Sequence, residues 1–70
     1  MIIFTNHVNV RMIERKITKE MVRQVVNSPD NTFRDAKNRI IAQKEFGRKI
    51  IEVIYAFNGE NEIVLTCYYL

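Results

Sequence analysis

The N-terminal part of the chain contains two segments in which apolar residues recur at helical spacing. In the first segment, Val8 and Met12 are four residues apart, so a helix would place them on one buried side. Thr5 or Asn6 can cap this helix, because short polar side chains accept hydrogen bonds from the first free N–H groups. The pattern predicts a helix from this cap to about residue 15 or 16.

The second helical segment begins at a new capping signal, Thr18. Glu20 follows in the first turn, where the helix dipole favours a negative charge. Pro29 ends the segment, because the residue before a proline is pushed out of the helical region. The side predicted to be buried consists of Met21, Val22, Val25 and Val26.

After Pro29 the apolar residues follow a period of two, which is typical of strands. Gly47 and the pair Asn58-Gly59 mark turns, because glycine and asparagine tolerate positive φ. We therefore expect an antiparallel meander of three or four strands after the helices. The segments predicted to form strands are residues 32–35, 39–46, 48–57 and 62–69, with a short β-prone start at residues 1–4.

Alternation along the last two strands predicts one apolar and one mixed face. A mixed face that carries Thr66 and Tyr68 is what an open site would need. The residues expected on the apolar face are Ile51, Val53, Tyr55, Phe57, Ile63, Leu65, Cys67 and Tyr69. The residues expected on the mixed face are Glu52, Ile54, Thr66 and Tyr68.

These elements predict one α+β domain over residues 1–70, with two N-terminal helices packed on a three- to four-stranded antiparallel sheet. Seventy residues, 47% of them hydrophobic, leave room for one domain with one core. No apolar run is long enough to span a membrane, and residues 1–4 are too short for a signal-peptide core. We expect a cytoplasmic protein with no membrane partner.

Positive charge is concentrated in the N-terminal part of the chain. The net charge is +3, and five of the eleven Lys and Arg residues fall between Arg11 and Arg23. Residues 52–70 contain three glutamates and no Lys or Arg. This distribution favours an anionic partner that binds the first helices.

The most informative group of polar residues is His7, Arg11 and Arg15, which recur every four residues on the first helix. Guanidinium groups donate paired hydrogen bonds to phosphate oxygens, and an imidazole can transfer a proton near neutral pH. These residue types together are suited to phosphodiester chemistry. Two alternatives stay open: Arg11 and Arg15 as partners of nearby carboxylates in surface salt bridges, and His7 as a packing or capping residue.

Other polar side chains could complete such a site. Lys44 and Arg48 bracket the predicted turn at Gly47 and would add a second cationic wall for phosphate, or serve solubility and edge protection. Thr66 and Tyr68 bring hydroxyl groups to the mixed face. The tyrosine ring would stack on a base or pack across strands.

Cys67 is the only cysteine, so it has no partner for an internal disulfide. Its apolar neighbours predict a small core residue, and a nucleophile activated by His7 is the alternative. The chain has no glycine-rich phosphate loop, no paired histidines and no Gly-x-Ser-x-Gly motif. We expect neither a cofactor nor a metal.

The order and spacing of short motifs over nearly the whole chain resemble a small bacterial and archaeal family, domain of unknown function 4258. That family is similar to the RelE and BrnT type toxins of toxin–antitoxin modules, which share a fold with barnase-like ribonucleases. The resemblance rests on Phe4-Thr5-x-His7, Arg11-Met12-x-Glu14-Arg15-x-Ile17, Glu20-x-Val22, Pro29, Arg39-Ile40, Lys44-x-Phe46-Gly47, Val53-Ile54-Tyr55 and Val64-x-Thr66-x-Tyr68.

The resemblance implies a RelE/barnase-like toxin architecture, RNA as substrate or ligand, and an antitoxin protein encoded nearby. It places His7 and Arg11 in the helix motif of the family. It places Arg15, Lys44, Thr66 and Tyr68 at the remaining polar positions of the family.

Three hypotheses about function follow. The first is a metal-independent endoribonuclease in which His7 transfers a proton, Arg11 and Arg15 hold the phosphate, and Thr66 or Tyr68 orients the substrate. The second is a non-catalytic module that binds RNA or an acidic protein. The third is a small domain that mainly forms a homodimer, since short chains often need a partner to bury enough surface.

Overall fold

Two threonines start the two helices of the computed structural model, which describes residues 1–70. Helix α1 spans Asn6–Arg15, and the Thr5 hydroxyl accepts a hydrogen bond from the Val8 N–H at 3.2 Å. Helix α2 spans Lys19–Asn27, and Thr18 caps it in the same way. Both predicted helices and their caps are confirmed. Neither helix is long and apolar enough to cross a membrane.

The strands follow the segments with a period of two. They are β1 Ile2–Phe4, β2 Asn31–Arg34, β3 Ile40–Phe46, β4 Lys49–Asn58 and β5 Asn61–Tyr69. Both long hairpins have a two-residue loop that begins with a glycine at positive φ, 62° at Gly47 and 64° at Gly59. Asn58 ends its strand, so only the glycine of the Asn58-Gly59 pair takes the left-handed conformation.

β1 makes the sheet five-stranded and mixed. The strand order is β1-β5-β4-β3-β2, and β1 runs parallel to β5 while the other neighbours are antiparallel. The predicted three- to four-stranded antiparallel sheet is therefore wrong in strand number and at one edge. After β1 the chain passes through both helices and re-enters at the opposite edge, so the meander brings β5 beside β1 in the same direction.

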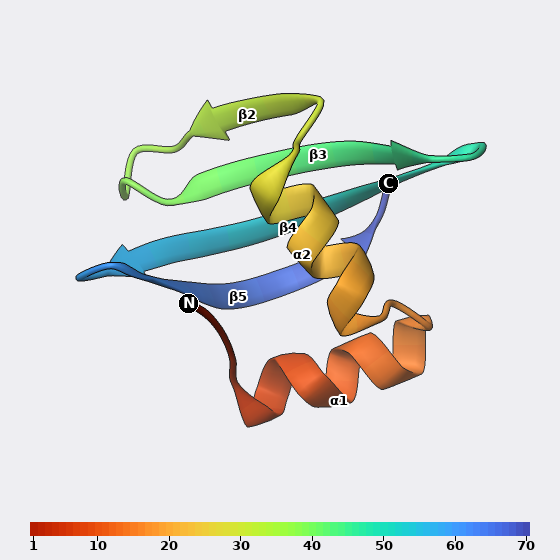
Figure 1. Cartoon of the computed structure of the whole chain (residues 1–70), viewed down its shortest axis with the longest axis horizontal. Coiled ribbons are helices and arrows are strands. Elements are labelled where there is room, and N and C mark those ends of the chain that lie inside the picture. Colours follow the sequence, from red (N-terminus) through yellow and green to blue (C-terminus); the bar gives the residue numbers. More distant parts are fainter.

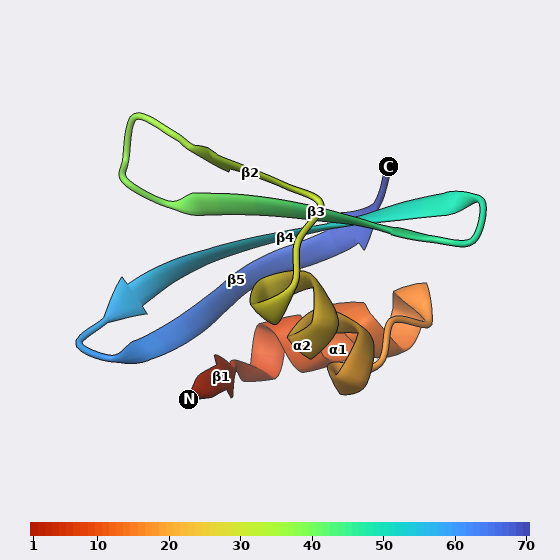
Figure 2. The same cartoon turned by 45° about the horizontal axis from the view of Figure 1, so that its top comes forward.

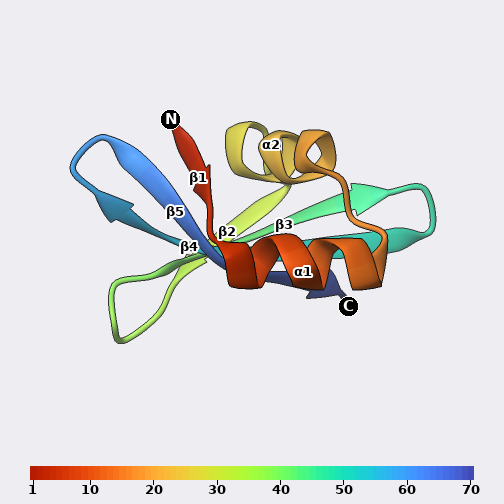
Figure 3. The ribbon, with the colours of Figure 1, turned by 90° about the horizontal axis from the view of Figure 1, so that it is seen from below.

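The helices form one layer and the sheet the other. Figures 1 and 2 show both helices on the same side of the sheet, with no helix on the other side. α1 packs against β5, and α2 packs against β3 and β4. In Figure 3 α1 runs beside β5 toward the C-terminal end of the chain. We call the uncovered side of the sheet the open face.

A β-bulge in β5 changes which residues reach the open face. Tyr55 pairs with Val64, but the preceding residue Ile54 pairs with Thr66, so Leu65 is an extra residue. Val64 before the bulge and Cys67 after it therefore both face the helices. The predicted strict alternation through β5 is wrong here, and the bulge moves Ile63 and Leu65 out of the predicted apolar face.

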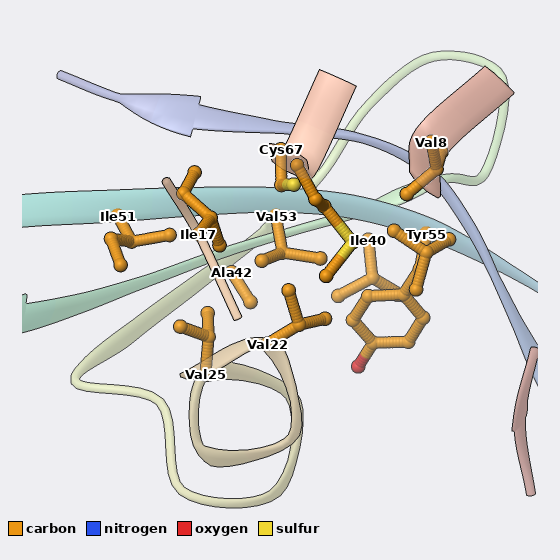
Figure 4. Packing of buried hydrophobic residues seen from close by; sticks show 12 residues of the cluster. Val8, Ile17, Val22, Val25, Ile40, Ala42, Ile51, Val53, Tyr55 and Cys67 are labelled. Carbon is orange, nitrogen blue, oxygen red and sulfur yellow. The ribbon is translucent and has the colours of Figure 1, made fainter. Parts of the chain in front are cut away.

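The core lies between the two layers. Figure 4 shows side chains of the central strands meeting those of α2 in the middle of the cluster. Burial of apolar surface stabilises this arrangement by about 25 cal/mol per Å². The buried apolar residues are Val8, Met12, Ile17, Val22, Val25, Ile40, Ala42, Ile51, Val53, Tyr55, Val64 and Cys67.

Candidate functional site

One flank of α1 carries His7, Arg11 and Arg15, which we call the α1 stripe. Val8 and Met12 are buried and fix the rotation of the helix on the sheet. His7 and Arg11 are exposed, whereas Arg15 is half-buried against β5. The stripe thus runs from solvent at one end to a contact with the sheet at the other.

Arg15 joins the α1 stripe to the free edge of β5. Its Nη1 donates a hydrogen bond to the Cys67 carbonyl oxygen at 2.8 Å. β1 pairs with β5 only over residues 62–64, so this carbonyl group has no strand neighbour on that side. A guanidinium has five N–H donors, and this bond orients the group while leaving donors for a ligand.

A polar row crosses the open face next to this edge. Gln43, Glu52 and Tyr68 are direct cross-strand neighbours on β3, β4 and β5, and we call them the Glu52 row. The Gln43 side-chain amide donates to one Glu52 oxygen at 2.7 Å, and the Tyr68 hydroxyl donates to the other. Glu52 is only 8% exposed and is the one charged side chain among the buried residues.

The phenol of Tyr68 is held in its neutral form. Its hydrogen bond to Glu52 and its partial burial both raise the pKa of Tyr68 above the ordinary value, against the opposing charge of Arg15. Arg15 donates to the carbonyl oxygen of Cys67, the residue before Tyr68. The α1 stripe and the Glu52 row therefore reach adjacent residues of β5, Cys67 and Tyr68.

An apolar row borders the Glu52 row on the open face. Phe33, Ile41, Ile54 and Thr66 are successive cross-strand neighbours on β2 to β5. Phe33 is 53% exposed, so its aromatic ring is accessible to solvent on the edge strand β2. No side-chain hydrogen bond of the structure uses the Thr66 hydroxyl. The open face thus pairs polar groups with apolar area, as the sequence predicts for a mixed face.

The structure brings some of the predicted site residues together. Arg15 reaches the strand that carries Thr66 and Tyr68, and it does so without a carboxylate partner. Arg11 does have one, since its Nη1 lies 3.4 Å from Glu14 Oε1 on the exposed helix surface. His7 makes no hydrogen bond or ion pair. The salt-bridge alternative therefore fits Arg11 and does not fit Arg15.

Lys44 and Arg48 are not part of this group. Lys44 pairs across the strand with Ile51, on the side that faces the helices. Its Nζ donates to the Ser28 carbonyl at 2.8 Å and lies 3.9 Å from Asp30 Oδ1, which fastens the end of α2 to the sheet. Arg48 is an exposed residue of the β3–β4 loop. Neither residue makes a contact with the α1 stripe that would form one cationic wall.

Cys67 is completely buried, which confirms the predicted core position. Burial raises the pKa of its thiol, only partly opposed by the charge of Arg15. The reactive thiolate form is therefore disfavoured. His7 is exposed while Cys67 is enclosed, so the alternative of an activated nucleophile is not supported.

A shallow hollow lies on the sheet beyond Gln43. It has a volume of about 270 Å³ and contains side chains of both charges. The structure brings no three His, Cys, Asp or Glu side chains together in a metal-binding cluster. The lining residues of the hollow are Asp30, Asn31, Gln43, Lys44, Glu45 and Ile50.

Sequence reasoning placed Glu52 on the mixed face but did not include it among the site residues. The available signal was a single carboxylate inside the long apolar run of β4. Its hydrogen bonds could not be foreseen, because they depend on the register of three strands.

The comparisons with known proteins identify a family. A family model described as "Domain of unknown function (DUF4258)" matches residues 4–69. No curated protein and no solved structure matches the chain.

Proposed function

We propose a function for this chain from its site, starting from the fact that it belongs to the family Domain of unknown function (DUF4258). The proposed function is that of a toxin-like, metal-independent endoribonuclease that holds the RNA backbone on the α1 stripe. Two helices on one face of an open sheet also fit the proposed RelE/barnase-like architecture, although β1 adds a parallel edge strand. Such an enzyme would act on RNA in the cytoplasm.

The observation that carries this proposal is the Arg15 contact with β5. It brings a cationic helix flank next to an open sheet face that carries the hydroxyl groups of Thr66 and Tyr68. Phosphate is the anion that guanidinium groups bind best in paired geometry. An imidazole at the exposed end of the same stripe adds a group that can transfer a proton.

The proposed reaction is a transesterification within the RNA strand. His7 takes the proton from a 2′-hydroxyl, whose oxygen attacks the adjacent phosphorus. The bond from phosphorus to the 5′-oxygen breaks, and the leaving oxygen receives a proton from the imidazolium or water. The products are a 2′,3′-cyclic phosphate and a 5′-hydroxyl. Arg11 and Arg15 stabilise the negative charge that develops on the phosphoryl oxygens.

The test is cleavage of end-labelled RNA by the purified protein in excess chelator. We expect cyclic phosphate ends, and we expect His7→Ala to lower the cleavage rate by about a hundredfold or more. Arg11→Ala should lower the rate by a smaller factor, because it removes one phosphate contact. Arg23→Ala is the matched control, since Arg23 is also a helical arginine with a glutamate three residues away.

Full activity in His7→Ala would remove His7 from the mechanism. Cleavage that needs a divalent cation would contradict the metal-independent reaction. Activity lost equally in Arg11→Ala and Arg23→Ala would show that general positive charge, rather than the α1 stripe, binds RNA.

A non-catalytic binding module is the second candidate, and a specific observation favours it. His7 has no hydrogen-bond partner to orient its imidazole, unlike the histidines of most general-base sites. A binding module would not cleave RNA. Its affinity for RNA would fall as the salt concentration rises, because binding to phosphates releases counterions. The protein partners proposed with either reading are an antitoxin encoded by a neighbouring gene and a second copy of the chain.

A further inference from the structure

The hydroxyl proton of Tyr68 points toward the protein. Glu52 is a carboxylate whose two oxygens accept from Gln43 and from Tyr68. A phenol has one proton to donate, and here that proton is used. Tyr68 is partly exposed, so what it can offer to a ligand is the lone pairs of its oxygen. Its ligand must therefore donate a hydrogen bond.

This requirement excludes a phosphate oxygen as the ligand of Tyr68. Phosphate oxygens are acceptors, and the negative charge of Glu52, which is hydrogen-bonded to the phenol, repels them as well. A phosphate belongs instead on Arg15, which bonds the backbone carbonyl of the residue before Tyr68 and retains free N–H donors. The group at Tyr68 is then one that lies next to a backbone phosphate in the nucleic acid.

The sugar is the neighbour of the phosphate, and only RNA gives it a donor. In an internal nucleotide the 3′- and 5′-oxygens are esterified, so the 2′-hydroxyl is the one sugar group that can donate. The same group distinguishes RNA from DNA. We propose that Tyr68, positioned by Glu52, accepts a hydrogen bond from a ribose 2′-hydroxyl and makes the site selective for RNA. This inference rests on the proposed binding of RNA by the α1 stripe.

A purely structural Glu52 row gives a different expectation. In that case the three side chains would only tie β3, β4 and β5 together, and every single strand of the same length and charge would bind equally. Selectivity for a donor at the 2′ position separates the two roles.

The experiment compares three single strands of one sequence: RNA, DNA, and RNA with 2′-O-methyl groups. Binding is measured by fluorescence anisotropy with the His7→Ala chain, so that no strand is cut during the titration. The 2′-O-methyl strand keeps the oxygen and loses only the donor. We expect RNA to bind about three- to tenfold more tightly than either other strand, the effect of one hydrogen bond.

Substitutions test whether the preference for RNA depends on Tyr68 and Glu52. Tyr68→Phe should bring the three affinities together, and Glu52→Ala should do the same because it releases the phenol proton. Tyr69→Phe is the matched control, since it removes a phenol whose hydroxyl donates to the Lys16 carbonyl at the end of α1. It should keep the preference for RNA. Circular dichroism checks that each variant is folded.

The outcomes distinguish this inference from the proposed function. One outcome would be that RNA and the 2′-O-methyl strand bind equally tightly, and that Arg11→Ala abolishes this binding. That outcome overturns the role of Tyr68 and leaves the proposed function standing. No binding of any strand overturns both. If Tyr68→Phe does not fold, the affinities of the chain that keeps Tyr68 for RNA, DNA and 2′-O-methyl RNA decide whether the site prefers a 2′-hydroxyl.

Discussion

Glu52 is buried on the open face only because both of its oxygens are satisfied. Removing a carboxylate from water costs several kcal/mol, and a fixed pair of hydrogen bonds offsets that cost. Gln43 and Tyr68 supply those bonds, and no buried side-chain polar atom of the structure lacks a partner. An apolar residue would fill this position in β4 without that requirement, so the Glu52 row is better explained by what it does than by stability.

The two arginines of the α1 stripe differ in how firmly they are held. Arg15 donates to a carbonyl oxygen in a half-buried contact, and such a charged hydrogen bond contributes about 1.5–3 kcal/mol. The Arg11 pair with Glu14 is exposed, and pairs of this kind contribute at most about 0.5 kcal/mol. Arg11 is therefore the cleaner residue to replace in a binding assay, because its loss leaves the fold intact.

Cys67 should be chemically inert in the folded protein. Its side chain is fully enclosed, and burial raises the pKa of the thiol, so neither access nor ionisation favours reaction. We expect a thiol reagent such as 5,5′-dithiobis(2-nitrobenzoate) to modify it only as fast as the protein unfolds. The same reagent should react promptly in concentrated urea. Rapid modification without denaturant would show that the β5 edge opens beneath Arg15.

The loop between β2 and β3 is organised by one carboxylate. Asp35 Oδ1 accepts hydrogen bonds from the backbone N–H groups of Arg39 and Lys37, each at 2.9 Å. Its Oδ2 accepts from Arg39 Nε at 2.6 Å. The Arg39 backbone bond is the largest of several influences that lower the pKa of Asp35 below its usual 3.8.

This loop should make stability depend on pH. Because the folded pKa of Asp35 is depressed, its stabilisation is present above pH 3.8 and is lost as pH falls through the folded value. In urea titrations, Asp35→Asn should therefore cost stability near neutral pH, and the difference from the unchanged chain should shrink on acidification below pH 3.8. Glu60→Gln, in the exposed β4–β5 loop, is the control. A difference that stays constant with pH would contradict the role of the charge.

Local signals explain why most elements could be predicted. The caps at Thr5 and Thr18, and the glycine that opens each long hairpin, act within a few residues of themselves. The parallel pairing of β1 was missed because three residues carry too little pattern and the partner strand lies at the other end of the sequence. The bulge at Leu65 was missed because nothing local at that residue signals it.

The candidate site divides in the same way. The α1 stripe follows from helical spacing alone, and the mixed face that holds Glu52 and Tyr68 follows from alternation. The contact of Arg15 with Cys67 is a tertiary one and could not be derived from spacing. Lys44 follows Ile40 and Ala42 at a spacing of two and so shares their side of β3, and the predicted second cationic wall did not take this spacing into account.

At the scale of the whole molecule, the two layers share one core. Residues of both helices and of the three longest strands belong to a single buried cluster. The pairing of Ile2 with Glu62 also ties the start of the chain to its last strand. Neither helix and none of these three strands can leave without exposing the apolar surface of the others.

Unfolding should therefore be a single cooperative event. We expect urea curves from far-ultraviolet circular dichroism, which reports mainly the helices, to coincide with curves from tyrosine fluorescence, which reports the sheet. The chain has three tyrosines and no tryptophan, so the second signal comes from β4 and β5 alone. Loss of the helix signal at lower urea would show that the helical layer detaches before the sheet melts.

The bulge at Leu65 shifts the in-out alternation of side chains along β5 by one residue. In a strand without the bulge, Val64, Thr66 and Tyr68 would all point to the same face of the sheet. With Val64 in the core, Tyr68 would then point into the core as well. The extra residue lets Val64 and Cys67 face the core while Thr66 and Tyr68 face the open side. Selection can thus alter the surface chemistry at Thr66 and Tyr68 while the packing at Val64 stays fixed. Straightening the bulge with Leu65 kept in the strand would exchange inside and outside along half of β5, whereas deletion of Leu65 would leave Thr66 and Tyr68 on the open face.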